Sequence, residues 1–292
     1  MERISRTACI ISIYVILMPA PSVLAWWEKG HRIIAANAVA VLPDDMPDFF
    51  KKGEATLVRL SVQPDMWKEF GNELRRAESP DHYLDTEYLA PIPAGVKFHR
   101  DRYLAMRNMY KQGLDPARVG MLPYRIMEDF QKLRGVFAQY RKNPEDLSIQ
   151  QEVLFYAGIL SHYAGDTAQP LHMTIHFNGR VNNEGRVIKG DGIHARFEGE
   201  FVRDFVESAD CKPHVRAPVL YLEMQDAIRQ AFTTSFTEVD RVYQLDESGQ
   251  LKKPNKETLT FGRQCLAHGS SFVASLWYTA WVTSEKVELP DR

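Results

Sequence analysis

The chain has 292 residues, of which 45% are hydrophobic and 25% are charged, a composition that supports a globular protein. Its 36 Lys and Arg residues face 38 Asp and Glu residues, giving a formal net charge of −2. The net charge therefore gives no indication that the chain binds nucleic acid.

Residues 1–25 have the features of a secretory signal peptide. Two arginines precede an apolar run that is interrupted by prolines, and the segment ends in Val-Leu-Ala. The apolar run is too short for a membrane span. We therefore expect cleavage between Ala25 and Trp26 and a secreted or periplasmic mature chain.

Apolar residues recur at the helical period along most of the remaining chain, and very little of it reads as strand. Pro- and Gly-bearing connections, notably 90–95 and 177–192, separate these segments. The pattern indicates one compact all-α domain over residues 26–292, without internal repeats or low-complexity tracts. The predicted helices are 31–42, 149–164, 192–206 behind a possible Asp191 cap, 219–232 and 258–281.

Three cysteines occur in the chain, and Cys9 falls within the predicted signal peptide. The mature chain keeps an even pair, Cys211 and Cys265. Outside the cytoplasm such a pair is a plausible disulfide, although spacing alone does not show that the two residues meet.

Two histidines are each followed, four residues later, by a carboxylate. His162 precedes Asp166 at the end of a predicted helix, and His194 precedes Glu198. One helical turn brings such a pair to the same face, where neutral imidazole and carboxylate both offer lone pairs to a divalent metal. A single pair is more simply an exposed hydrogen bond, but two pairs together with His172 favour a metal site. Asp65 and His82 add a carboxylate and an imidazole upstream.

The segment from His162 to His172 reads HYAGDTAQPLH, and its pattern HxxGDxxQPLH resembles the signature of the S1/P1 nucleases and the bacterial zinc phospholipases C. These two groups share an all-helical fold and a cluster of three zinc ions. The resemblance extends to the start of the mature chain, where a first-position Trp is followed by Gly and His at the fifth and sixth positions. Here these residues are Trp26, Gly30 and His31, and the resemblance ends near Glu198.

The resemblance implies a full set of zinc ligands. The free amine and carbonyl oxygen of Trp26 are expected to bind metal once the signal peptide is removed. One zinc is expected at Asp65, His82, His162 and Asp166; a second at Trp26, His31 and Asp166; and a third at His172, His194 and Glu198.

Hydrolysis of an anionic phosphodiester needs a nucleophile at neutral pH and cations that disperse negative charge, and paired zinc ions supply both. We expect Asp65 to orient the attacking water or act as its base. Lys68, where family members carry a basic residue, is expected to stabilise the phosphoryl oxygens as a point charge. The alternative for Lys68 is an ordinary solvated surface lysine.

The short interval between Trp26 and His31 resembles the nucleases, and Tyr83 occupies a position where nucleases carry an aromatic ring that could stack on a base. His176 is a second candidate for substrate contact. Two features depart from the nucleases. Residues 178–183 replace their Gly-Gly-Asn stretch. Glu198 stands where the nucleases usually have Asp, and in this it resembles the phospholipases.

Three functions follow. The favoured one is a monomeric endonuclease that cleaves single-stranded DNA or RNA to 5′-phosphate products, without a stable protein partner. The first alternative is a phospholipase C acting on phospholipid head groups, which would need an apolar rim around the site. The second is a non-catalytic zinc-binding helical protein.

Overall fold

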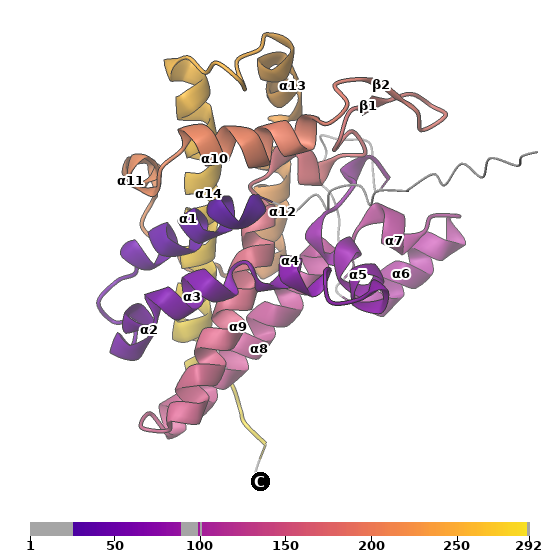
Figure 1. Cartoon of the computed structure of the whole chain (residues 1–292). Helices are drawn as coiled ribbons and strands as arrows, with labels where there is room; N and C mark the ends of the chain where they lie inside the picture. Colours follow the sequence, from indigo (N-terminus) through magenta and orange to yellow (C-terminus); the bar gives the residue numbers. More distant parts are fainter. Residues whose placement is uncertain (1–25, 89–98, 100, 291–292) are drawn as a thin grey trace, which may run out of the picture.

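Helices make up nearly all of the regular structure in the computed structural model, which describes residues 26–88, 99 and 101–290 (Figure 1). The α-helices are α1 (Trp27–Ala40), α2 (Asp48–Lys52), α3 (Glu54–Leu60), α4 (Gln63–Trp67), α5 (Asn72–Glu78), α6 (Arg102–Lys111), α7 (Pro116–Val119), α8 (Leu122–Lys142), α9 (Leu147–Asp166), α10 (Val202–Phe205), α11 (Ser208–Cys211), α12 (Met224–Phe236), α13 (Val239–Glu247) and α14 (Lys256–Thr283). A π-helix, η4 (Ala195–Phe201), precedes α10.

Short 3₁₀-helices and one hairpin complete the described secondary structure. The 3₁₀-helices are η1 (Ser79–His82), η2 (Thr86–Tyr88), η3 (Pro170–Met173), η5 (Lys212–His214) and η6 (Ser284–Lys286). The strands β1 (Arg180–Val181) and β2 (Val187–Lys189) pair antiparallel, with Arg180 opposite Lys189. The predicted all-α fold class is therefore confirmed.

Helix α9 runs through the middle of the molecule, where it packs against α8, α3 and α14 (Figure 1). Its apolar stripe, which includes Val153, Ala157, Leu160 and Ala164, is completely buried. Burying such a stripe removes apolar surface from water at about 25 cal/mol per Å². The stripe thus fixes the rotation of α9 and decides where the polar residues at its C-terminal end point.

Helix α1 crosses the long helix α14 and also contacts α3 and α9. The backbone at the start of α1 is unusual, because Trp26 and Trp27 have φ angles of 41° and 34°. These angles lie in the left-handed region, which residues other than Gly rarely adopt. The Trp26 side chain is fully buried. The beginning of α1 is therefore built into the core.

Three of the five predicted helices are confirmed, with ends that differ by a few residues. The segment 31–42 lies largely in α1, 149–164 in α9 and 258–281 in α14. The segment 192–206 contains η4 followed by α10, so its central turns are π-helical rather than α-helical. The connection 177–192 contains the β1–β2 hairpin.

The prediction of a helix from residue 219 is wrong, because α12 begins only at Met224. The backbone N–H groups of Arg216, Val219 and Tyr221 instead donate to a row of hydroxyls spaced four residues apart on α14, those of Ser271, Ser275 and Thr279. These bonds hold residues 216–221 in an irregular extended segment along α14. The helical period of the sequence cannot reveal hydrogen-bond partners supplied by another helix.

The predicted disulfide between Cys211 and Cys265 is absent from the structure, in which both are buried free thiols. Arg263 on α14 bonds Asp210, next to Cys211. Cys265 lies two residues farther along, about 200° around the helix, and therefore points away from that contact. Side chains close together in the α14 sequence contact different elements. An even number of cysteines therefore does not show that two of them meet.

The predicted signal peptide, with Cys9, and the connection 90–95 lie outside the described residues. Within the part of the chain that the structure describes, no helix is both long and apolar enough to cross a membrane.

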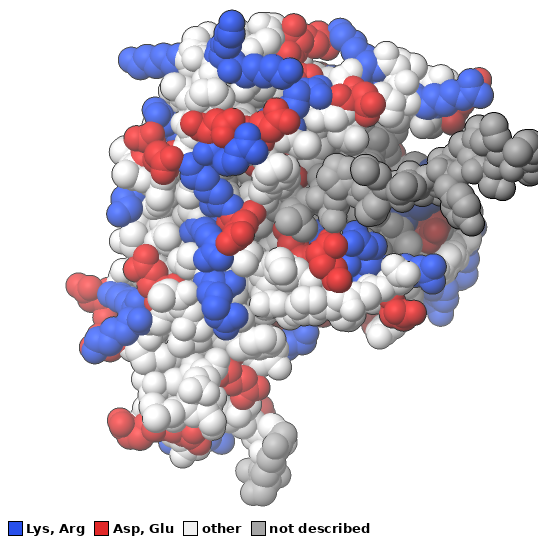
Figure 2. Space-filling view, viewed as in Figure 1, with Lys and Arg blue, Asp and Glu red and all other residues white. Residues whose placement is uncertain are grey.

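Lys and Arg side chains form a band over α1 and α10 on the face shown in Figure 2, with acidic side chains beside it. Lys29 pairs with Glu207, and Arg32 pairs with Glu28. Neighbouring carboxylates therefore neutralise these two cations of α1.

Candidate metal centre

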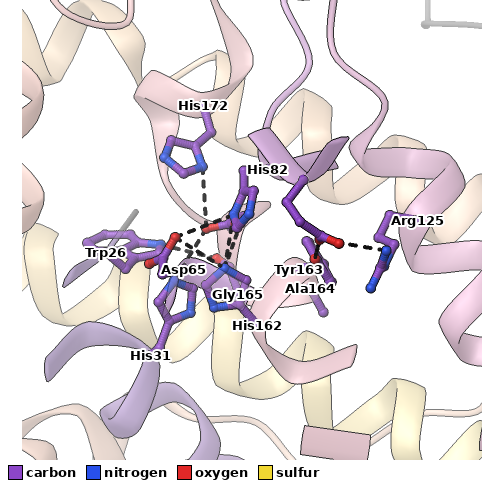
Figure 3. A network of polar contacts seen from close by, with 12 residues as sticks. Trp26, His31, Asp65, His82, Arg125, His162, Tyr163, Ala164, Gly165 and His172 are labelled. Carbon is purple, nitrogen blue, oxygen red and sulfur yellow. Dashed lines mark hydrogen bonds and ion pairs between the residues drawn. The ribbon is translucent and has the colours of Figure 1, made fainter. Parts of the chain in front are cut away.

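Figure 3 shows five of the predicted ligands together near the C-terminal end of α9: His31, Asp65, His82, His162 and His172. His162 and Asp166 lie one turn apart on this helix and are both fully buried. The other side chains come from α1, α4, η1, η3 and the start of η4. All eight predicted side-chain ligands are at most 6% exposed: His31, Asp65, His82, His162, Asp166, His172, His194 and Glu198.

Four of these residues form the first donor group: Asp65, His82, His162 and Asp166. His82 Nδ1 lies 3.0 Å from His162 Nε2 and 3.2 Å from Asp166 Oδ2. Asp65 Oδ1 lies 3.7 Å from His82 Nδ1 and 3.8 Å from His162 Nε2. Ligands of a tetrahedral zinc ion, at about 2.0–2.2 Å from the metal, are roughly 3.3–3.5 Å apart. The spacing of the first donor group therefore fits one such ion.

Asp166 presents its two carboxylate oxygens to different neighbours. Oδ2 faces the first donor group, lying 3.6 Å from His162 Nε2. Oδ1 lies 3.5 Å from His31 Nε2 and 3.4 Å from His172 Nδ1. This arrangement fits a bridging carboxylate, and Trp26, His31 and Asp166 are the predicted second donor group.

The third donor group, His172, His194 and Glu198, approaches Asp166 through His172. Its ligand atoms are close together, with 3.2 Å between the Nε2 atoms of the two histidines and 2.7 Å between His194 Nε2 and Glu198 Oε2. The backbone nitrogen of Trp26 donates to the same Glu198 oxygen at 2.9 Å. The predicted N-terminal ligand therefore lies beside the donor side chains.

Close backbone packing explains two glycines of the sequence patterns. A Cβ at Gly30 would lie 2.9 Å from Trp26 Cβ, and one at Gly165 would lie 3.3 Å from the His31 ring. The Gly165 carbonyl also accepts a hydrogen bond from the Trp26 indole at 3.1 Å. These contacts let the first turn of α1 approach the end of α9.

Burial controls the charge of the donor groups. It lowers the pKa of His31, His82 and His162 well below 6.5, so these imidazoles are neutral, the form that binds metal. Burial also raises the pKa of Asp166 well above 3.8, and Asp65 reinforces this effect by charge repulsion. A cation among these groups would offset the cost of burying the carboxylates.

Several buried polar atoms at the centre have no hydrogen-bond partner within the described chain, including both ring nitrogens of His31, Asp166 Oδ1 and His172 Nδ1. Buried polar groups in proteins are usually satisfied. Nitrogen and carboxylate oxygen donors in three groups are the ligand set that zinc prefers. The residues present therefore fit the predicted zinc ions.

A cleft of about 960 Å³ opens onto the donor groups, with His82, His172 and His194 in its lining. Lys68 also lines it, and its ammonium lies 2.6 Å from Asp65 Oδ1. Lys68 is only 8% exposed, so the alternative of a solvated surface lysine is wrong. Tyr83 and His176, the predicted substrate contacts, line the same cleft.

One residue that supports a predicted ligand was not assigned from the sequence. Gln169 donates to Glu198 Oε2 at 2.9 Å and accepts from the Leu171 backbone, so it orients a predicted ligand. The QPLH pattern, which contains Gln169, was the sequence feature that could have indicated this role. Asp85 lines the cleft, and burial together with Glu87 raises its pKa to about 8.

The chain is similar to known proteins over most of its length. Among curated proteins, a probable serine protease from Bradyrhizobium tropiciagri is 22% identical over 367 residues, covering 91% of this chain. The chain spans only 45% of that relative's length. Two solved structures are similar at 14% identity: the alpha toxin of Clostridium absonum, with a TM-score of 0.41, and the alpha-toxin of Clostridium perfringens, with a TM-score of 0.40. The similarity covers 88% and 87% of this chain and 66% and 63% of the toxins.

A family model for S1/P1 nuclease matches residues 26–200. The matched region is more than half of the chain, and it contains all nine predicted ligands, from Trp26 to Glu198. The chain belongs to the S1/P1 nuclease family.

Proposed function

We propose that this protein is an exported zinc-dependent endonuclease that cleaves single-stranded DNA or RNA and leaves 5′-phosphate ends. The observation that carries the proposal is the convergence of three groups of buried histidines and carboxylates beside a cleft that His82, His172 and His194 line, in a chain whose family is that of the S1/P1 nucleases. The family supports a phosphodiester hydrolase, and the nucleic-acid substrate is the finer part of the proposal.

Zinc ions held by the three donor groups would acidify water and neutralise charge on the phosphate. The first ion is assigned to Asp65, His82, His162 and Asp166; the second to Trp26, His31 and Asp166; and the third to His172, His194 and Glu198. Trp26 acts through its free amine and carbonyl oxygen after cleavage at Ala25.

The chain's own residues then orient the reaction. Asp65 holds the attacking water and accepts its proton. Lys68, kept in place by its 2.6 Å contact with Asp65, places a positive charge beside the phosphoryl oxygens. Because both side chains are almost completely buried, their attraction is screened less than it would be at the surface.

Tyr83 and His176 are the proposed substrate contacts in the cleft. The Tyr83 hydroxyl donates to the Ala117 carbonyl, which anchors the ring at the cleft wall. His176 is held by Tyr243, whose hydroxyl donates to its carbonyl, and by the Val181 N–H, which donates to its Nδ1. Fixed rings of this kind can stack on unpaired bases.

Phospholipase C activity is the second candidate, because apolar side chains are exposed near Lys68 and at the cleft. Met66 and Phe70, two residues to either side of Lys68, are 43% and 63% exposed, and the cleft residue Phe177 is 49% exposed. An apolar rim suits contact with a lipid surface. Glu198, in place of the usual nuclease Asp, also favours this candidate.

The test is a direct comparison of substrates. Processed protein beginning at Trp26 is loaded with zinc and offered single-stranded DNA, RNA and phosphatidylcholine vesicles. The proposal expects cleavage of nucleic acid with 5′-phosphate ends and negligible release of phosphocholine. Cleavage of the lipid alone would replace it with phospholipase C activity, and the absence of any hydrolysis by zinc-loaded protein would favour a non-catalytic role.

A further inference from the structure

The two histidines of the first donor group are oriented differently. His162 Nδ1 lies 2.7 Å from the Ser61 carbonyl, which accepts its N–H and leaves Nε2 for the donor group. His82 Nδ1 faces the donor group, but its buried Nε2 has no hydrogen-bond partner among the described residues. Metal-binding histidines usually donate their second N–H to a protein group that fixes the ring. The Nε2 side of the His82 ring is therefore held by something other than a hydrogen bond.

The Tyr163 ring packs against the His82 ring. Its centroid lies 5.2 Å from that of His82, with the two planes tilted by 55°, and 5.2 Å from that of His162 in an edge arrangement. Tyr163 is completely buried and follows His162 on α9. Close-packed aromatic rings restrict one another's rotation. Tyr163 thus limits the rotation of the His82 imidazole, whose Nε2 has no hydrogen-bond partner among the described residues.

Tyr163 is itself clamped by charged residues (Figure 3). Its hydroxyl donates to Glu78 Oε2 at 2.7 Å, and the Arg125 guanidinium lies 4.5 Å from the ring centroid. Arg125 also lies 3.8 Å from Glu78. The cation over the ring face and the hydrogen bond at the hydroxyl together restrict the movement of the Tyr163 side chain.

The backbone of His82 is tied to the same network through Asp81. Asp81 is 4% exposed and accepts from Arg102 at 2.8 Å and from Arg125 at 3.4 Å. Arg125 in turn donates to Asp129 at 2.7 Å. Arg125 therefore connects the residue before His82 with the ring that packs against it.

We infer that Tyr163, clamped by Arg125 and Glu78, is a positioning residue that aims His82 Nδ1 at the first donor group. The inference rests on the proposed zinc centre. It assigns to Tyr163 an effect on metal affinity that a purely packing role would not have.

The test measures zinc affinity by competition with a chromogenic chelator, using protein that begins at Trp26. Tyr163→Leu removes the ring, and we expect it to weaken binding of one zinc ion about 10–100-fold, the usual effect of losing a group that orients a ligand. Tyr163→Phe keeps the ring and the Arg125 contact and should lose less than threefold. Arg125→Met keeps the ring but removes its clamp and should give an intermediate loss. Hydrolysis should show a lower kcat with little change in KM.

Phe137→Leu is the matched control, because Phe137 is a buried ring in the same bundle that packs on Phe50 and Trp281. It should lower the Tm of metal-free protein without changing zinc affinity. If Tyr163→Leu and Arg125→Met behave like this control, or if Tyr163→Phe loses as much affinity as Tyr163→Leu, the inference is wrong. Wild-type protein that binds no zinc would overturn the proposed function and this inference with it.

Discussion

Trp26 and Glu198 are 172 residues apart in the sequence, yet the backbone nitrogen of Trp26 lies 2.9 Å from Glu198 Oε2. Glu198 also contacts His194 and His172, so the first residue of the proposed mature chain meets the third donor group. Only a free amine has a lone pair for a metal, because the nitrogen of a peptide bond is delocalised.

Adding one Ala before Trp26 should remove a ligand from the centre. We expect the extended protein to bind about one zinc ion less and to lose at least tenfold in kcat/KM on single-stranded DNA, in line with the loss of a metal-supporting group. Zinc content is measured by elemental analysis of both proteins after dialysis. Equal zinc content and equal activity would show that the Trp26 amine is not a ligand.

Replacing Lys68 with Met should lower kcat about 10²–10³-fold, the effect of removing one group that stabilises transition-state charge. The variant also leaves Asp65 without its 2.6 Å partner. Lys52→Met is the control, because Lys52 forms a surface pair with Asp48, and such pairs contribute little. Wild-type kcat in Lys68→Met would remove Lys68 from the catalytic assignment.

Removing zinc should destabilise the fold. Ligand present at about 1,000 times its Kd stabilises a protein by about 4 kcal/mol, which corresponds to roughly 8–16 °C in Tm for a domain of 150–250 residues. We expect a decrease of about this size after chelation, measured by differential scanning calorimetry. Zinc should restore the Tm and magnesium should not, because the donor groups are rich in imidazole nitrogen. Recovery with magnesium would contradict a zinc centre.

Asp85 should make metal-free protein less stable as the pH rises. Its pKa is about 8 in the folded chain, against 3.8 ordinarily, chiefly because burial disfavours the charged form. Its contribution to stability is therefore complete below pH 3.8 and is lost as the pH rises through 8. Relative to Asp85→Asn, the wild-type free energy of unfolding should fall by roughly 1 kcal/mol per pH unit across this window. Urea unfolding of both proteins measures the difference, and parallel curves would contradict the prediction.

Both cysteines should react as free thiols. Burial raises the pKa of Cys211 to about 12 and that of Cys265 higher still, so neither forms a reactive thiolate near neutral pH. We expect no reaction of folded protein with a thiol reagent and two equivalents of reaction in urea without a reductant. Zero equivalents in urea would show that the two cysteines are joined.

The sequence predicts the parts of this molecule that depend on local spacing. The pair His162 and Asp166 needs only one helical turn, and the apolar stripe of α9 is visible as a period. The resemblance to a known family supplied the more distant members of the centre, such as Trp26 and Asp65, which no local pattern connects.

Features that depend on partners from elsewhere in the chain could not be predicted. Helix α8 was not identified, because charged residues such as Asp129 interrupt its pattern of apolar residues. Asp129 is buried in the structure, where Arg125 and Lys132 pair with it. Tyr163 reads as an ordinary core aromatic until the rings of His82 and His162 are placed beside it.

The left-handed backbone at Trp26 bears on the proposed cleavage before this residue. Its φ angle of 41° places a large side chain in a conformation that costs about 1–2 kcal/mol. The peptide bond that the proposed cleavage would break defines this angle, so cleavage would remove the strain. Exposure of the amine and a gain in stability of the folded chain would then come from the same step.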